Sequence, residues 1–561
     1  YISCMTKPYA KSYDGFLKVR LCMYRRVQRT LSQRSPGAYI WLCILLFVLS
    51  ACGGGASAAK ATQPAAQQIL TFPNVGITDP AVLDPALGPD QNSQMIVNMV
   101  YSGLVRLSQD ATVLPDQASH WQISHDQRVY TFTLRPGVKF SNGRPVTAQS
   151  YVYSWTRALL PAVSSPTALP SMQMIEGAAS VHRGKTQTLS GVRALDDHTL
   201  QVTLQQPTPY FLTSLTQSVF FPVNQKLVTR YGQKNWSRMI EGNGVGTGPF
   251  MVKQWQHNVR MVFVPNPHYY GRKLHLDAVN MYFVNDPSIA FEMYRAGQTD
   301  MVWDLPFSTL GPASMQAQQW ETDSLFFNTK TAPFNNLKVR QAFAHALDKS
   351  FIAHTAFKSN VKPAYSLLPP GIPGYQFNYT GLPYDRFLAK GLLQPIYPDA
   401  TSMPPVTFSY PSSHLNEIQA AAIQQMLEVN LGIQVNVQAI EPTAYDDMMQ
   451  KHLIQFGFVQ WGASLADPYA YLVNLLSTSS HNPGQWSNAS FDQTLQQAEQ
   501  VGGMAHNRLC HQAEQIALSN VALMPLDTPT LAMVHSPKVH GVEINGNGLY
   551  FGDWGDVYMS A

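Results

Sequence analysis

The sequence predicts an α/β protein with two or more domains. Its 561 residues are more than a single hydrophobic core usually organises. Hydrophobic residues make up 45% of the chain and charged residues 13%, which is typical of a globular protein rather than a disordered one. Short apolar strands alternate with amphipathic helices along the chain, and this order is typical of an α/β fold.

The N-terminal segment, residues 1–52, predicts a lipoprotein signal peptide. Eight Lys or Arg residues and one acid precede the apolar run at 40–51. The twelve residues of this run suit a signal sequence but are too few to span a bilayer. The run ends in Leu-Ser-Ala-Cys52, which resembles a bacterial lipobox, so we expect Cys52 to be lipidated. A plain secretory signal with a chance Cys is the alternative. Residues 53–68, rich in Gly, Ala, Ser and Gln, predict a flexible linker.

The formal net charge of +4 comes from this signal segment. Residues 1–51 contribute +7, and +4 minus +7 leaves −3 for the rest of the chain. The body therefore shows no basic footprint of a nucleic-acid partner. After signal cleavage only Cys52 and Cys510 remain, so the mature chain has no disulfide framework and must depend on its core.

The first part of the body predicts a strand, a turn-rich loop and a helix, at 69–72, 83–90 and 93–104. A small mixed α/β unit follows over 109–217. Within it, alternating residues predict three strands, and Thr147 predicts the N-cap of a helix. These strands and the helix are expected at 129–134, 138–140, 198–204 and 147–157.

The Gly-rich stretch at 241–250 resembles a dinucleotide-binding loop only superficially. A strand, and not a helix, follows it, so no helix N-terminus is available for a pyrophosphate. We interpret the stretch as a turn that leads into a β-meander. The elements expected next are strands at 249–255, 259–264, 278–284 and 301–303, and a helix at 286–296.

A second large body begins near residue 325. Gly432 is expected to end its second helix, and the strand that follows it alternates at period two, which predicts one buried face. Its expected strands are 325–329, 433–440, 456–459 and the extended 521–527, and its helices are 334–347, 415–429 and 490–501.

Several motifs together resemble family 5 of the extracellular solute-binding proteins of ABC importers, the oligopeptide- and dipeptide-binding type. They occur in the order of that family over nearly the whole mature length. The motifs are Tyr130-Thr-Phe-Thr-Leu-Arg-Pro-Gly-Val-Lys-Phe-Ser-Asn-Gly143, Tyr151-Val-Tyr-Ser-Trp-Thr-Arg157, Gly246-Thr-Gly-Pro-Phe250, Phe327-Asn328, Val339-Arg-Gln-Ala-Phe343, Leu368-Pro-Pro-Gly371 and Trp461-Gly-Ala-Ser464.

The resemblance implies a two-lobed fold like that of periplasmic binding proteins (type II, cluster C), with an extra subdomain in the first lobe and two crossovers near 320–326 and 524–530. The lobes would close on a ligand by hinge motion. The implied division is a first lobe of 69–108, the extra subdomain 109–217, 218–322 and the C-terminal return 529–561, with 323–528 as the second lobe.

The resemblance also implies a function. We expect a lipid-anchored receptor on the outer, periplasmic side of the cytoplasmic membrane, which captures peptides or peptide-like solutes and delivers them to an ABC permease with its ATPase subunits. A monomer without cofactor, metal or nucleic acid is expected. The sequence has no Gly-x-Ser-x-Gly motif, no His-Glu-x-x-His motif and no recognisable catalytic Cys signature, so we do not expect an enzyme.

The segment from Trp461 to Tyr469 is the predicted ligand-facing part of the second lobe. Trp461 and Gly462 suit a cleft wall, although a core Trp with an ordinary loop would look the same. In the peptide binders of this family an Asp that pairs with the ligand's α-ammonium usually stands at the position of Ser464. A hydroxyl cannot neutralise that charge, so Asp467 is a candidate substitute.

The same departure keeps a non-peptide solute open, such as an oligosaccharide, a nickel chelate or an opine-like compound. Tyr445 and Tyr469 are candidate pocket walls, with plain packing as the alternative. In the first lobe, residues 90–92 (Asp90, Gln91 and Asn92) are candidates for an edge along the ligand. His506, Cys510 and His511 could hold a soft metal, but without a fourth ligand nearby we expect a helix surface.

Overall fold

A computed structural model describes residues 67–80, 83–87, 91–233, 235–241, 246–303, 305, 314–357, 361–462, 465–550 and 553–561. All of them belong to one compact unit, Pro64–Ala561. The predicted signal peptide, Cys52 and nearly all of the predicted linker lie outside the described residues.

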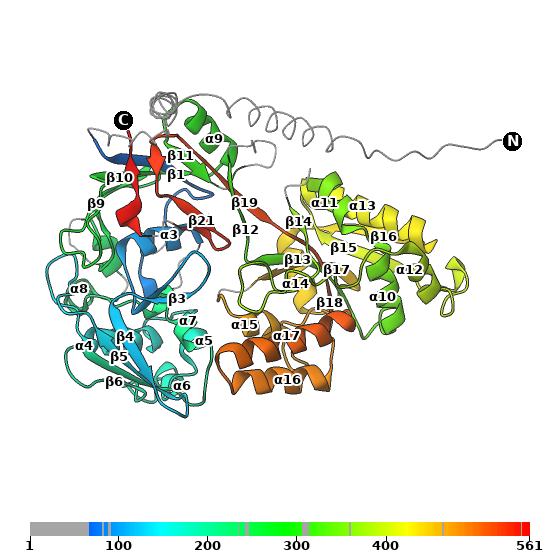
Figure 1. Ribbon diagram of the computed structural model, residues 1–561, viewed down its shortest axis with the longest axis horizontal. Helices are drawn as coiled ribbons and strands as arrows, with labels where there is room; N and C mark the ends of the chain where they lie inside the picture. Colours follow the sequence, from blue (N-terminus) through cyan, green and yellow to red (C-terminus); the bar gives the residue numbers. More distant parts are fainter. Residues whose placement is uncertain are drawn as a thin grey trace, which may run out of the picture. The chain divides into compact units, whose positions relative to one another are not determined.

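The first lobe is organised by a four-stranded sheet in which β1 lies parallel to β10 and the other neighbours are antiparallel (Figure 1). Leu70, Phe72 and Met281 of the sheet are fully buried against Ile96 of helix α3 (Gln91–Val100). The strands in spatial order are β1 (Ile69–Val75), β10 (Ala278–Val284), β9 (Arg260–Pro265) and β8 (Phe250–Gln256).

Helix α3 ends earlier than the predicted residue 104. The amide of Gly248 donates to the carbonyl of Val100 at 2.8 Å, in the last turn of the helix. A Cβ at Gly248 would lie 2.6 Å from the Val100 carbonyl carbon, so glycine permits this approach. The Gly-rich stretch therefore ends a helix instead of holding a phosphate.

The extra subdomain has its own antiparallel sheet and its own core. Thr147 is the N-cap of helix α4 (Ala148–Leu159), as predicted, and the structure adds a capping box with Ser150; the helix buries Tyr151 and Trp155. The predicted strand at 138–140 is wrong: Gly137 and Gly143 have positive φ and turn the chain, leaving only an isolated bridge there. The strands in spatial order are β4 (Ala118–Ile123), β5 (Val129–Leu134), β7 (Thr199–Thr203) and β6 (Val192–Ala194).

The second lobe is built on a six-stranded mixed sheet with separate cores on its two faces. The buried face predicted over 433–440, where the edge strand β16 lies, is confirmed at Ile433 and Val435 but wrong from Val437 on, where the strand, which has a neighbour on one side only, is mostly exposed. Gly432 ends helix α13 in a left-handed conformation, as predicted. The strands in spatial order are β14 (Lys362–Pro363), β18 (Leu523–Thr528), β13 (Glu321–Phe327), β17 (Phe456–Gly462), β15 (Val406–Pro411) and β16 (Val435–Ile440).

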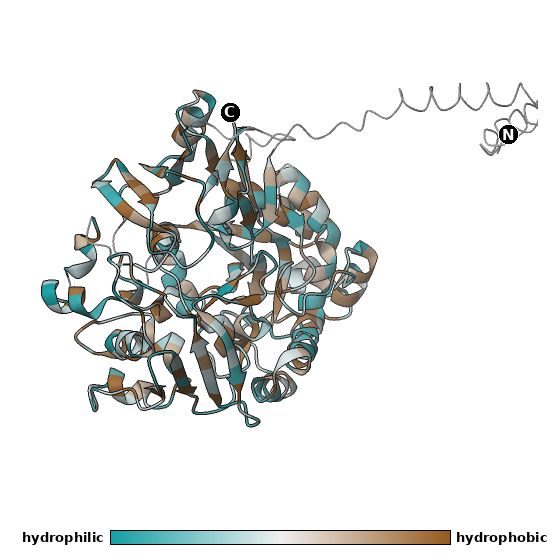
Figure 2. Ribbon diagram, turned by 60° about the vertical axis from the view of Figure 1, so that its left-hand side comes forward, coloured by the Kyte–Doolittle hydropathy of each residue, from teal (hydrophilic) through white to brown (hydrophobic). Residues whose placement is uncertain are grey.

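The helices of the second lobe pack their apolar residues on the two cores, and in Figure 2 the ribbon of the outer helices changes between teal and brown along its length. Those that contribute to one core are α10 (Leu337–Ala346), α11 (Lys349–Phe357), α12 (Arg386–Leu393) and α13 (His414–Leu431). Those that contribute to the other are α14 (Pro442–Gln450), α15 (Pro468–Leu472), α16 (Ala489–Glu499) and α17 (Gly503–Ser519).

Two adjacent connections join the lobes. The chain leaves β12 (Met315–Gln318) for β13, and it leaves β18 for β19 (Thr530–His535), and both β12 and β19 belong to a sheet with β11 (Met301–Trp303). The amide of Gln319 donates to the carbonyl of Pro529 at 2.8 Å, so the connections are hydrogen-bonded to each other. This places any hinge between the lobes at a pair of coupled strands.

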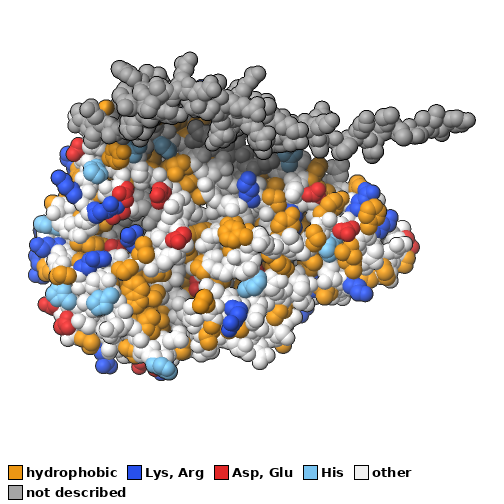
Figure 3. All heavy atoms as spheres, viewed as in Figure 1, with side chains coloured by type: hydrophobic (Ala, Val, Ile, Leu, Met, Phe, Trp, Pro, Cys, Tyr) orange, Lys and Arg blue, Asp and Glu red, His pale blue; other side chains and the backbone are white. Residues whose placement is uncertain are grey.

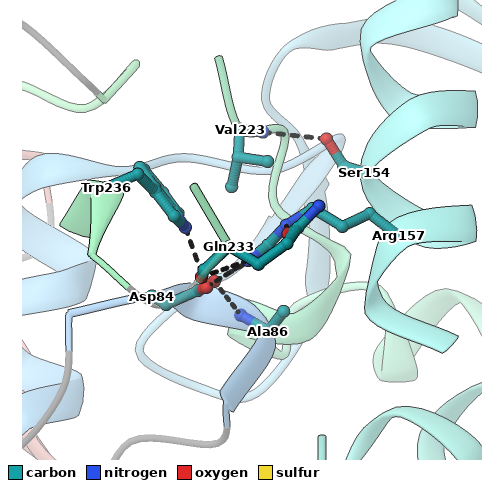
Figure 4. A network of polar contacts seen from close by, with 7 residues as sticks. All are labelled: Asp84, Ala86, Ser154, Arg157, Val223, Gln233 and Trp236. Atoms are coloured by element: carbon teal, nitrogen blue, oxygen red, sulfur yellow. Dashed lines mark hydrogen bonds and ion pairs between the residues drawn. The ribbon is translucent and has the colours of Figure 1, made fainter. Parts of the chain in front are cut away.

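A buried ion pair attaches the extra subdomain to the first lobe (Figure 4). Arg157 of α4 and Asp84, each with a side chain 1% exposed, form two hydrogen bonds. Asp84 also accepts from Trp236 Nε1 at 3.0 Å and from the amide of Ala86 at 3.0 Å. Arg157 Nε donates to the Gln233 side chain at 2.6 Å. Each charge therefore has several partners, as a buried ion pair requires.

Arg157→Leu should destabilise the protein strongly, by about 3–5 kcal/mol, because it leaves the Asp84 carboxylate buried without its counter-charge. Urea-unfolding midpoints measure the loss. Arg295→Leu is the matched control: its ion pair with Glu292 is exposed, and we expect a loss below about 1 kcal/mol. Equal losses in the two variants would contradict this account of the pair.

Candidate functional site

A cavity of about 680 Å³ lies in the first lobe, within the size range of small-ligand pockets. Its walls come from segments far apart in sequence, among them α3, β2 (Val105–Leu107), β3 (Val113–Pro115), the end of β11 and the hairpin of β21 (Glu543–Asn545) and β22 (Gly548–Tyr550). The labels α3, β3 and β21 fall together in the left half of Figure 1.

The lining mixes aromatic, amide and charged side chains. Aromatic rings give a ligand a rigid contact surface, and amides and charges orient it. The aromatic members are Tyr101, Phe221, Tyr269, Tyr270, Trp303 and Trp554, the amides are Gln94, Asn98, Asn545 and Asn547, and the charged members are Arg106, Arg135, Arg272, Asp116 and Asp553.

A short loop positions the two tyrosines of the wall. The side chain of Asn266 accepts from the amide of His268 at 2.9 Å and donates to the carbonyl of Gly248 at 2.8 Å, so it fastens the loop to the segment that ends α3. Tyr269 and Tyr270 follow directly, and the Tyr270 hydroxyl donates to the carboxylate of Asp116.

The acids of the cavity already have partners. Burial raises the pKa of Asp116 to about 6, although its bond from Tyr270 and the nearby Arg106 and Arg135 act in the opposite direction. Asp553 accepts from Arg272 Nε at 2.8 Å and from the amide of Gly555 at 2.9 Å.

Several hydrogen-bond donors of the cavity lack partners. In the described part of the chain, the side chain of Arg106 makes no hydrogen bond or ion pair. The Tyr101 hydroxyl and Trp303 Nε1 are buried, and they too have no partner among the described residues. Among its described lining residues, the cavity thus has hydrogen-bond donors without partners, whereas each of its carboxylates accepts at least one hydrogen bond.

The predicted second-lobe residues lie elsewhere. Trp461 is 5% exposed on β17 and pairs with Thr322 of the crossover strand, and Gly462 beside it is exposed opposite Glu321. Neither lines the cavity. Ser464 lies outside the described residues.

Asp467 is already bonded within the second lobe. It is the N-cap of α15, accepts from the amide of Tyr469 at 2.9 Å, and lies 3.2 Å from His506 Nε2. Burial lowers the pKa of His506, but its bonds to Asp467 and Cys510 outweigh this and raise it to about 10. His506 therefore supplies a counter-charge to Asp467.

The two candidate tyrosines are packed. The Tyr445 hydroxyl is buried and donates to the carbonyl of Phe458 at 2.6 Å. Tyr469 stacks on Tyr210 of the extra subdomain, with ring centroids 5.4 Å apart. Their roles in ligand binding stay predictions.

In the first lobe, Asp90 lies outside the described residues, as do the side chains of Gln91 and Asn92. The latter two begin α3, and the following turns of this helix supply Gln94 and Asn98 to the cavity wall. The predicted ligand edge at residues 90–92 is thus followed directly in sequence by residues that line the cavity, and its own role in ligand binding stays a prediction.

The predicted helix surface at His506 and Cys510 is wrong. Both side chains are buried in α17, where they face Asp467. Among the described residues, no group of three or more His, Cys, Asp or Glu could hold a metal ion. No helix in the described ranges has the length and apolar character needed to cross a bilayer.

The sequence reasoning missed most of the cavity. Residues 269–272, Trp303 and residues 545–548 were not singled out. One signal was available: Tyr269-Tyr-Gly271 after Asn-Pro has the aromatic-plus-glycine character that drew attention to Trp461 and Gly462. No local pattern marks residues 545–548 as neighbours of α3.

Asp116→Asn should change how stability depends on pH. In the folded protein the pKa is about 6, above the ordinary 3.8, so the stability that this carboxyl contributes is full below pH 3.8 and is lost as pH rises through 6. Relative to wild type, the variant should gain up to about 3 kcal/mol between pH 3.8 and 7.

Urea midpoints at several pH values test this. Asp447→Asn, which removes an exposed acid, is the control and should follow the wild type. A curve for Asp116→Asn that stays parallel to the wild type would show that Asp116 titrates normally.

Comparisons with known proteins point to one family. The profile described as bacterial extracellular solute-binding proteins, family 5 Middle, matches residues 112–483. The oligopeptide-binding protein OppA of Bacillus subtilis is 29% identical, covering 91% of this chain and 97% of its own length. An Escherichia coli protein named "Probable deoxycholate-binding periplasmic protein YgiS" is 31% identical, covering 90% and 96%.

A solved structure shares the fold. The murein tripeptide-binding protein MppA, in a form titled unliganded and open, superposes with a TM-score of 0.79 at 28% identity. The match covers 89% of this chain and 99% of that protein.

Proposed function

Because the chain belongs to the bacterial extracellular solute-binding proteins of family 5, we propose that it is the receptor of an ABC importer for peptides or peptide-like solutes. It would bind the solute between two closing lobes and deliver it to a permease with ATPase subunits. Relatives named as oligopeptide- and murein tripeptide-binding proteins support the peptide as the first candidate.

The observation that carries this proposal is the direct link between the cavity and the crossover. Trp320, between β12 and β13, donates its amide to the carbonyl of Gly546 in the cavity hairpin at 2.8 Å. Its own carbonyl accepts from the Tyr471 hydroxyl of α15 at 2.8 Å. A ligand that displaces residues 545–548 would therefore act on the strand that joins the lobes.

Membrane attachment is the second part of the proposal. A lipid on Cys52 and the linker after it would keep the binding body at the outer face of the cytoplasmic membrane, close to the permease. On the face of the body that Figure 3 shows, acidic and basic side chains are interspersed.

A second candidate solute is a bile-acid-like amphiphile. The relative with deoxycholate in its printed name is 31% identical over 90% of this chain. The aromatic wall of the cavity could cover an apolar steroid face. This candidate changes the solute and leaves the receptor role unchanged.

A thermal-shift experiment on residues 53–561 tests the proposal. A mixed oligopeptide pool should raise the melting temperature, because ligand at a hundred times Kd adds about 2.7 kcal/mol to the free energy of unfolding. A shift with deoxycholate and none with peptides would replace the first solute by the second. No shift with peptides, deoxycholate or oligosaccharides would remove the receptor proposal.

Ser464→Asp should favour peptides with a free N-terminus over their N-acetylated forms by about tenfold, because a carboxylate there would pair with the α-ammonium. Ser464→Asn is the matched control, of similar size without the charge, and should show no such preference. Isothermal titration of both peptide forms measures it. An equal effect on the two forms would rule out this explanation of Ser464.

A further inference from the structure

We propose that the first-lobe cavity selects ligands that carry a carboxylate, and that Arg106 is the residue that binds it. This inference rests on the proposed receptor function and specifies the chemistry of its ligand. It assigns a specificity-determining role to a residue that no sequence motif had marked.

Arg106 has an unused binding capacity. Its half-buried side chain extends from β2 and lines the cavity, yet it makes no hydrogen bond or ion pair within the described ranges. A guanidinium is always charged and offers five N–H donors in a planar fork that matches a carboxylate. A ligand carboxylate would give this partly desolvated charge the partner that it lacks.

The other arginines of the cavity are already engaged. Arg272 pairs with Asp553 at 2.8 Å and also with Asp556. Arg135 Nε donates to the backbone carbonyl of Asp116 at 2.6 Å. Among the cavity-lining arginines of the described chain, Arg106 is thus the one whose guanidinium makes neither a hydrogen bond nor an ion pair.

The carboxylates beside the cavity are bonded to groups other than Arg106. Three arginines and two aspartates line it, and Arg272 is shared between the lining Asp553 and the neighbouring Asp556. Asp553 is bonded to Arg272 and Asp116 accepts from the Tyr270 hydroxyl, so both acids act on Arg106 only through space, without an ion pair. A ligand ammonium would meet no free carboxylate among the described lining residues.

The unpaired donors fit the same ligand. The Tyr101 hydroxyl and Trp303 Nε1 belong to lining residues that are 1% and 4% exposed, and neither atom has a hydrogen-bond partner in the described chain. Buried donors without acceptors are costly, and a ligand rich in acceptor oxygens would relieve that cost.

The carboxylate could come from an acidic side chain or from the C-terminus of a peptide. Four matched tripeptides separate these sources: Ala-Glu-Ala and Ala-Gln-Ala, each with a free and with an amidated C-terminus. Isothermal titration would compare wild type, R106Q and the control R193Q, which removes the same charge from an exposed position on β6 outside the cavity.

The reference peptide is Ala-Gln-Ala amide, which has no carboxylate. We expect wild type and R193Q to bind at least one of the carboxylate-bearing peptides about tenfold more tightly than this reference, and R106Q to lose that preference. R106Q should lose more affinity for the carboxylate forms than for Ala-Gln-Ala amide, whereas a merely structural role of Arg106 would weaken the binding of all four peptides alike. If amidation of the C-terminus abolishes the preference, the bound carboxylate is that of the C-terminus. If exchange of Glu for Gln abolishes it, the bound carboxylate is that of the side chain.

Two results would overturn the inference. One is equal binding of all four peptides by wild type, which would contradict the role of the carboxylate but agree with the proposed peptide-receptor function. The other is a carboxylate preference that survives in R106Q.

If none of the tripeptides binds, deoxycholate and its methyl ester are compared in the same three proteins. Tighter binding of the acid than of the ester by wild type and R193Q, but not by R106Q, would support the carboxylate inference and contradict the peptide as the solute. Equal binding of acid and ester, or no binding of either, would contradict the carboxylate inference.

Discussion

The buried pair of Arg157 and Asp84 fixes how the extra subdomain joins the first lobe. Removing two charges from water is costly, and their mutual attraction seldom repays the cost alone. Here Trp236, Gln233 and the backbone of Ala86 complete the bonding, so the pair fits one arrangement of α4 against the loop before α3.

The crossover shows how this rigid first lobe can communicate with the second. Trp320 approaches the cavity hairpin so closely that a Cβ at Gly546 would lie 2.2 Å from its ring, and on its other side it is bonded to Tyr471. Burial raises the pKa of Asp323 and of Asp527, which face each other on the two crossing strands. Protonation of one of these carboxyls would therefore relieve their repulsion where the lobes are joined.

The sequence predicted what local pattern determines. Thr147 and Gly432 marked helix ends, and the order of motifs indicated the family, which the comparisons confirm. It failed where neighbours in space decide. The strand at 138–140 is prevented by turns on both sides, and β16 is mostly exposed from Val437 on because it is an edge. Residues more than 400 positions apart in sequence, such as Asn98 and Asn547, line the same cavity, and no hydrophobic period or motif spacing in the sequence reveals that they do so.

The distribution of charge partners explains why the ligand chemistry inferred here differs from an ammonium-binding one. An acid that recognises an amine must be free, but Asp467 has His506, Asp553 has Arg272, and Asp116 receives the Tyr270 hydroxyl. Ser464 adds no charge of its own. Among the charged side chains described around the cavity, that of Arg106 makes no hydrogen bond or ion pair, and a fixed cation in a partly desolvated wall favours anions and disfavours cations for the same electrostatic reason. Selectivity then follows from which charges the fold has already neutralised.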